Sequence, residues 1–136
     1  MADLGITGSQ VLRVSGPIEH GTAGEALTAG MAVYLTTAST WKKADANVSA
    51  VEAAAGGIAL DDAATGQPVT VQRSGVINLG AAAAAAAGSI YCVSNVAGKI
   101  CPSTDKGSGD YVTVLGIGIG ANKVKLALNP SGATIP

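Results

Sequence analysis

The stretch Gly57-Ile58-Ala59-Leu60-Asp61-Asp62-Ala63-Ala64-Thr65-Gly66-Gln67-Pro68-Val69-Thr70-Val71-Gln72 decides the fold that the sequence predicts. At its start, the large apolar residues Ile58 and Leu60 alternate with the small Ala59. At its end, Val69 and Val71 alternate with Thr70 and Gln72. A two-residue period is typical of half-buried strands. The residues between favour a turn, because Asp bonds its own backbone, Gly reaches positive φ and Pro fixes φ. The stretch therefore predicts two strands joined by a turn.

A similar block returns near the C-terminus, which indicates an internal repeat. Both copies carry a Gly-Ile strand, a later strand with apolar residues two apart, and an upstream Ala-Gly pair followed by a tyrosine. The matching segments are 29–35, 57–60 and 69–71 in the first copy, and 87–92, 116–119 and 124–126 in the second. These landmarks keep one order, so we interpret them as two versions of one β unit.

Short strands with turn signals between them predict an all-β fold, a small β-barrel or sandwich. Long helices do not alternate with the strands, which makes an α/β fold improbable. We expect an extended N-terminal arm over residues 1–24, a first β unit over 25–80 and a second over 81–136, with 25–136 forming one compact domain. The arm is either disordered or becomes ordered on a neighbouring subunit.

Composition narrows the class of protein. Charged residues are 12% of the chain, Gly is 19 of 136 residues, Phe is absent and the formal net charge is -1. Such a surface relies on Ser, Thr and Asn for solubility or is buried against partners, and we favour partners. The eight Lys and Arg are scattered, which argues against nucleic acid. The longest apolar run, residues 81–87, is too short to span a membrane, and the start of the chain shows no secretion signal.

No set of residues predicts catalysis, a metal or a cofactor. His20 is the single histidine, and Asp61 and Asp62 are explained by turn formation. The glycines of Gly116-x-Gly118-x-Gly120 alternate as in a strand, which bares one face for a close backbone or ring rather than forming a phosphate loop. We expect the alanines of residues 81–87 to form a connector packed closely against the sheet. We expect no enzyme.

Two cysteines, Cys92 and Cys101, flank an expected hairpin turn. They are either two small buried thiols or a cross-strand disulfide formed after release from the cell. A zinc site is improbable because these two thiols and His20 make an incomplete ligand set.

With these residues laid out, the chain resembles the capsid decoration, or cement, proteins of tailed bacteriophages. The resemblance lies in Gly24-Glu25-Ala26-Leu27-Thr28-Ala29-Gly30-Met31-Ala32-Val33-Tyr34-Leu35, Lys43-Ala44-Asp45-Ala46 and the opening of the deciding stretch. It continues in Gly66-Gln67-Pro68-Val69-Thr70-Val71-Gln72-Arg73-Ser74-Gly75-Val76 and Gly109-Asp110-Tyr111-Val112-Thr113-Val114-Leu115-Gly116. It covers most of residues 24–128, and the chain departs from the pattern at residues 81–87.

The resemblance implies a non-enzymatic structural protein on the outside of the mature head, within the virion but made in the host cytoplasm. Its implied partners are the major capsid protein and two further copies of itself in a homotrimer, with an N-terminal arm that helps to bind the shell. We therefore expect residues 2–18 to become ordered on the capsid and Arg13 to pair with a capsid carboxylate. The expected partner-binding residues are Leu4, Ile6, Leu12, Arg13, Val14 and Trp41.

A second interpretation is a carbohydrate-binding or adhesin module. It would need an exposed aromatic platform, for which the chain offers Trp41, Tyr34, Tyr91 and Tyr111. An enzyme would need a concave pocket with convergent polar groups, and no residues are evident to line one.

Overall fold

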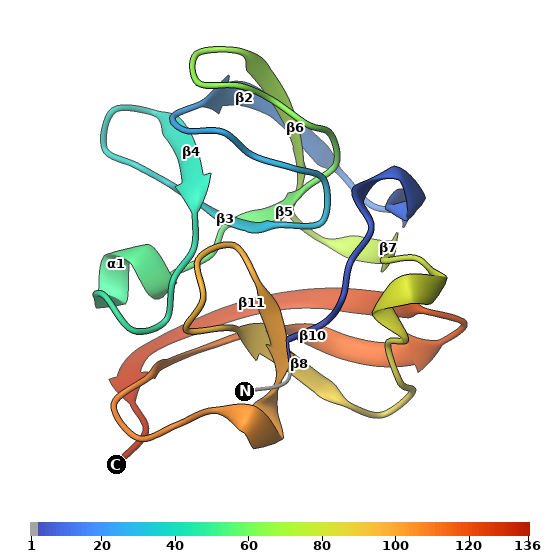
Figure 1. The fold of residues 1–136 in the computed structure, drawn as a ribbon, viewed down its shortest axis with the longest axis vertical. Coiled ribbons are helices and arrows are strands. Elements are labelled where there is room, and N and C mark those ends of the chain that lie inside the picture. Colours follow the sequence, from blue (N-terminus) through green and yellow to red (C-terminus); the bar gives the residue numbers. More distant parts are fainter. Residues whose placement is uncertain (1–2) are drawn as a thin grey trace.

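The computed structural model describes residues 3–136 and confirms the all-β prediction: a closed barrel lies beside a six-stranded sheet (Figure 1). The barrel order is β2-β4-β3-β5-β6, and the sheet order is β1-β7-β11-β10-β8-β9. The strands in the described residues are β1 (Leu12–Ser15), β2 (Ile18–Ala23), β3 (Ala32–Leu35), β4 (Thr40–Lys43), β5 (Gly57–Ala59), β6 (Pro68–Gln72), β7 (Gly75–Asn78), β8 (Ile90–Val93), β9 (Ile100–Pro102), β10 (Tyr111–Gly120) and β11 (Lys123–Thr134).

Short helical segments connect the strands. They are η1 (Gly8–Gln10), α1 (Ala50–Ala53), η2 (Ala81–Ala83) and η3 (Ser103–Asp105). The α1 turn begins directly after Ser49. Ser49 caps it, because its hydroxyl accepts a 3.2 Å hydrogen bond from the Glu52 amide.

The deciding stretch forms β5 and β6, but its first strand is buried on both faces. Ile58 points into the main core between barrel and sheet, whereas Ala59 packs inside the barrel with Val69 and Val71. The expected half-buried alternation is therefore correct for β6 from 68 to 71 and wrong for β5. It is also wrong for Gln72, which is fully buried.

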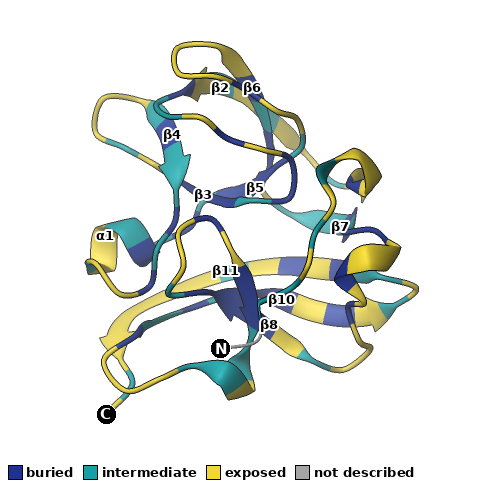
Figure 2. Ribbon diagram, viewed as in Figure 1, coloured by how far each residue is buried: buried dark blue, intermediate teal, exposed yellow. Residues whose placement is uncertain are grey.

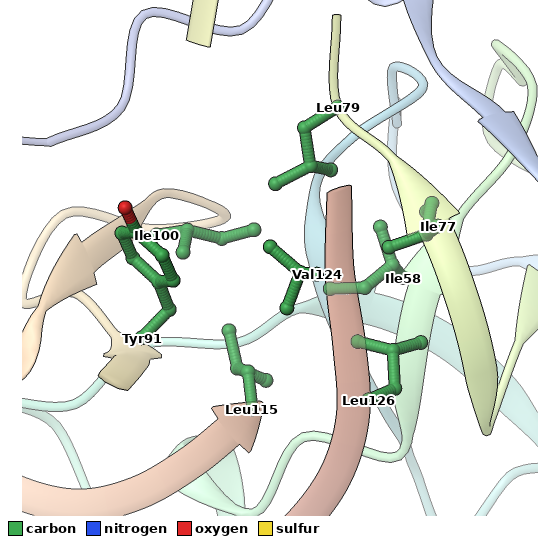
Figure 3. A pocket seen from close by; sticks show the side chains of 8 residues that line it. All are labelled: Ile58, Ile77, Leu79, Tyr91, Ile100, Leu115, Val124 and Leu126. Atoms are coloured by element: carbon green, nitrogen blue, oxygen red, sulfur yellow. The ribbon is translucent and has the colours of Figure 1, made fainter. Parts of the chain in front are cut away.

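Two apolar cores hold the molecule together. The barrel interior is centred on Trp41, which is 1% exposed. The larger core lies between the barrel wall and the inner face of the sheet. Figure 3 shows side chains from both layers converging there: Ile58, Ile77, Leu79, Tyr91, Ile100, Leu115, Val124 and Leu126. The residual space among them is about 10 Å³, so this is a packed core rather than a ligand cavity.

The internal repeat is visible in the order of strand pairing. In the first copy, β4-β3-β5-β6-β2 are neighbours in that order, and in the second copy β9-β8-β10-β11-β7 follow the same order. Gly30 and Gly88, from the two Ala-Gly landmarks, both adopt positive φ, at 91° and 83°. The copies therefore span β2 to β6 and β7 to β11, so the division falls near residue 74 rather than 80. The first copy closes into a barrel because β2 also pairs with β4.

Residues 3–24 do not form the separate arm expected from the sequence; Met1 and Ala2 lie outside the described residues. β2 pairs with β6 along five positions and completes the barrel, and β1 pairs with β7 at the edge of the sheet. Ahead of them, Leu4 and Ile6 pack against the main core. Removing residues 2–18 would therefore damage the fold, because it takes away the edge strand β1 and the apolar contacts of Leu4 and Ile6.

The glycines of β10 admit a close neighbour as predicted, but the alanine connector packs closely only in part, because Ala83 and Ala85 are buried and its other five alanines are exposed. A side chain at Gly118 would collide with the carbonyl oxygen of Ala86, and would lie 3.3 Å from the Tyr91 ring. Hydrogen bonds fix this approach, because the Gly118 amide donates to Ser89 and its carbonyl accepts from Gly88. The bare glycine face thus admits both a backbone and a ring.

Candidate protein-binding surface

Cross-strand register places a row of side chains on the outer face of the six-stranded sheet. Lys125 pairs with Val76 on one side and with Ile117 on the other, and Ile117 pairs with Ile90. The row therefore crosses β7, β11, β10 and β8 without a break. Figure 2 shows why it faces away from the core: buried and exposed residues alternate along β10 and β11.

The exposed members of this face are mainly large and apolar. Ile117 and Ile90 are 47% and 43% exposed, and Ile119 follows on the same side of β10 at 49%. At the free edge, β1 adds Leu12 and Val14, at 64% and 48%. We call these five residues with Val76 and Lys125 the sheet-face patch. Exposed apolar side chains gathered in this way mark interaction sites more often than scattered ones do.

The charge of the six-stranded sheet has one sign. None of its strands contains Asp or Glu, whereas they contain the cations Arg13, Lys123 and Lys125. Every acidic residue lies elsewhere, in β2, in loops or in the short helical segments. The sheet-face patch therefore suits a partner surface that is apolar at its centre and carboxylate-bearing at its margin.

A shallow hollow of about 260 Å³ adjoins the patch at Ile90. Its remaining lining comes from the approach to β8 and the end of β9: Gly88, Ser89, Pro102, Ser103 and Thr104. The lining mixes apolar carbon with hydroxyl groups and includes no ionisable side chain. A hollow beside an exposed isoleucine is a suitable seat for one projecting side chain of a partner.

The structure divides the six expected partner-binding residues into two groups. Leu12, Arg13 and Val14 lie together on β1, where the whole strand is exposed, and the Arg13 guanidinium donates to the Gly16 carbonyl at 3.0 Å. Leu4 and Ile6 are only partly exposed and pack against the main core. Trp41 is enclosed in the barrel, with Arg73 above its ring at 5.7 Å. These last three are structural residues and present little surface to a partner.

Sequence reasoning missed Ile90, Ile117, Ile119 and Lys125. The alternation around these residues identified strands. It could not show on which face of the sheet each side chain lies, because that depends on the register between strands. Register in turn depends on irregularities in β10, where pairing shifts between Val114 and Gly116. The absence of acids from residues 63–104 and 111–136 was the signal in the sequence that could have indicated this face.

The aromatic platform of the carbohydrate-binding interpretation does not form. Trp41, Tyr34 and Tyr91 are 1%, 8% and 3% exposed, and Tyr111 alone is partly exposed. Burial, followed by the charges of Glu52 and Glu25, raises the pKa of Tyr34. His20, on β2, is exposed, and its Nδ1 lies 3.3 Å from the Thr70 hydroxyl. This interpretation therefore lacks the stacking surface it needs.

A metal-binding cluster and a membrane-spanning helix are also missing from residues 3–136. No group of three His, Cys, Asp or Glu side chains comes together there in a way that could hold a metal ion. In the same residues, no helix has the length and apolar character needed to cross a membrane. Asp61 and Asp62 accept hydrogen bonds of 2.9 Å from the amides of Thr70 and Ala29, which belong to other segments, so these carboxylates link segments rather than bonding the backbone of their own turn as predicted. The sheet-face patch is therefore the strongest candidate for function in the described chain.

In comparisons with known proteins, no family model matches the chain and no relative is found among curated proteins.

Proposed function

We propose that this protein is a capsid decoration protein that binds the outside of a tailed-phage head through its sheet-face patch and stabilises the shell. The observation that supports the proposal is the uninterrupted outer row of Val76, Lys125, Ile117 and Ile90 on a sheet without carboxylates. The implied location is the exterior of the virion, and the implied partner is the major capsid protein.

A decoration protein has to hold neighbouring subunits together rather than transform a ligand. A β face with exposed isoleucines provides contact area at a low cost in side-chain entropy, because β-branched side chains have few rotamers. Lys123 and Lys125, on the outer face, add electrostatic attraction to a carboxylate-bearing shell, and this attraction weakens as salt rises. The pairing of Arg13 with a capsid carboxylate, which the resemblance led us to expect, is kept as part of the proposal.

A homotrimer is part of the proposal because it multiplies a weak contact. Three patches on one body bind a symmetric lattice more tightly than one, since the second and third contacts are intramolecular. Two exposed apolar residues lie outside the sheet-face patch, Val48 just before α1 and Val51 within it, and are available for contacts between copies.

Co-sedimentation with expanded heads that lack this component tests the proposal. Purified protein is titrated onto the heads, bound copies are counted, and the heat resistance of loaded heads is compared with that of bare heads. The proposal expects saturable binding in multiples of three per capsid face and a higher temperature of head disruption. Lack of binding to expanded heads, by a protein shown to be folded, would contradict it.

A further inference from the structure

Cys92 and Cys101 stand directly opposite each other on the paired strands β8 and β9. Both thiols are free in the structure, and the residues are 1% and 0% exposed. Their chain neighbours Tyr91, Val93 and Ile100 point into the main core, so the two thiols lie on the opposite face of the hairpin. The two thiols are therefore neighbours on one face of the hairpin, outside the main core.

The backbone pairing indicates how far apart the two cysteines are. The Ser94 amide donates to the Lys99 carbonyl at 3.1 Å, and Cys92 and Cys101 lie two positions further along each strand. They therefore belong to the hydrogen-bonded kind of antiparallel pair, whose Cα atoms are about 5.5 Å apart. Disulfides join Cα atoms at roughly 4.4–6.8 Å. The pair can be bridged, with a small adjustment of the ladder to bring the Cβ atoms together.

A polar segment, residues 103–110, follows β9 and lies against this hairpin. Lys106 donates from Nζ to the Val93 carbonyl at 2.8 Å, and the Gly107 amide donates to Asp110 Oδ2 at 3.0 Å, which closes the loop on itself. Burial raises the pKa of both thiols, and the Lys106 charge offsets only part of the rise. The thiols are thus held protonated until this segment opens, and reaction requires that opening.

We infer that Cys92 and Cys101 are a reversible dithiol–disulfide pair that closes by exchange with a small-molecule disulfide. One cysteine thiolate attacks a sulfur of oxidised glutathione, forming a mixed disulfide and expelling one glutathione thiolate. The second cysteine thiolate then attacks the protein sulfur of that mixed disulfide, forming the Cys92–Cys101 bond and expelling the second glutathione thiolate. The two cysteines are oxidised, the glutathione disulfide is reduced, and the two protons pass to the departing thiolates. The adjustment of the ladder strains the bond, so reduced glutathione should reopen it.

The test uses the full-length protein, first reduced and then freed of reductant. It is incubated with excess oxidised glutathione at pH 8, both in the folded state and during refolding from denaturant. Remaining thiols are alkylated in denaturant and counted by intact mass. The expected result is loss of both alkylatable thiols without retained glutathione, and recovery of both after excess reduced glutathione. Cys101→Ser, which cannot close the second step, should instead retain one glutathione.

Three outcomes would overturn the inference. The first is a wild-type protein that retains glutathione in a stable mixed disulfide, which would mean that the partner thiol cannot reach it. The second is two alkylatable thiols after both incubation and refolding in the oxidant. The third is an internal disulfide that excess reduced glutathione does not reopen. An internal disulfide that forms only during refolding supports the pair and assigns the barrier in the folded state to residues 103–110.

Discussion

The side-chain amide of Gln72 donates a hydrogen bond to the carbonyl oxygen of Ser15 at 2.8 Å, linking the last residue of the barrel strand β6 to the edge strand β1 of the sheet. The same nitrogen lies 2.9 Å from the Ser74 carbonyl and 3.0 Å from that of Val76. Three backbone carbonyls from two segments therefore converge on one fully buried side chain. Its oxygen has no hydrogen-bond partner among the described atoms, so the amide is oriented for donation alone.

Replacing Gln72 by Leu should destabilise the fold by about 2–3 kcal/mol, because buried carbonyl groups lose their donor while the side-chain volume is nearly kept. Equilibrium urea unfolding followed by Trp41 fluorescence measures the loss. Gln67→Leu is the matched control, since the Gln67 side chain accepts one exposed hydrogen bond from Ala64 and should cost less than about 1 kcal/mol. Equal stability of the two variants would mean that the hydrogen bonds from Gln72 contribute little to the free energy of unfolding.

The fold could be predicted to the extent that local patterns determine it. The strands around Val69 and Val71 followed from their period, and the glycines of β10 correctly indicated a close approach by backbone and ring. Strand β2 was missed because Ile18 to Ala23 shows little alternation. Gly21 is there for a tertiary reason, since a Cβ would lie 2.6 Å from the indole nitrogen of Trp41. No neighbour in sequence reveals that requirement.

The candidate surface was less predictable than the fold. Leu12 and Val14 were expected to bind a partner as members of an N-terminal arm, and they lie instead on the exposed edge strand β1. Trp41 was expected to bind a partner, and the closure of the barrel, which the sequence does not reveal, places it in a core instead. Ile117 and Ile90 become neighbours through pairing between strands more than twenty residues apart, which a pattern within one strand does not encode.

Gly118→Ala should destabilise the protein by about 2 kcal/mol or more, because the new methyl group collides with the Ala86 carbonyl. The connector cannot move away freely, since Gly88 and Ser89 are hydrogen-bonded to Gly118 itself. Thermal unfolding should show a melting temperature lower by roughly 5–10 °C. Gly107→Ala is the control: its added carbon would lie 3.5 Å from Asp110 Oδ2, an ordinary contact, and should leave the melting temperature nearly unchanged. A wild-type melting temperature for Gly118→Ala would contradict the packing described for the connector.

Stability should fall in alkali because of Cys101. Burial raises the pKa of this thiol from 9.0 to about 12 in the folded protein. The folded state therefore keeps a proton that the unfolded state loses above pH 9, so the free energy of unfolding is undiminished below pH 9 and decreases as pH rises toward 12. The loss attributable to this group is on the order of 2–4 kcal/mol.

Urea unfolding of wild type and Cys101→Ala at pH 8 and at pH 11 isolates that contribution, because the two proteins share every other ionisable side chain. The difference between the two pH values should be larger in wild type by part of this amount. A pH dependence that is the same in both proteins would show that the Cys101 thiol ionises as easily in the folded state as in the unfolded state.

A single charge in the sheet-face patch should prevent binding without disturbing the fold. Ile90→Asp places a carboxylate on an exposed position of β8, next to Ile117 in the row, where a partner would have to desolvate it. Binding to expanded heads should fall at least tenfold, corresponding to about 1.4 kcal/mol or more. Leu35→Asp is the matched control, because Leu35 is 44% exposed against 43% for Ile90 but lies on the barrel strand β3. Both variants should unfold at similar urea concentrations. If Leu35→Asp lost head binding and Ile90→Asp kept it, the binding face would be on the barrel, and the cations Lys123 and Lys125 of the sheet would have no role in attachment.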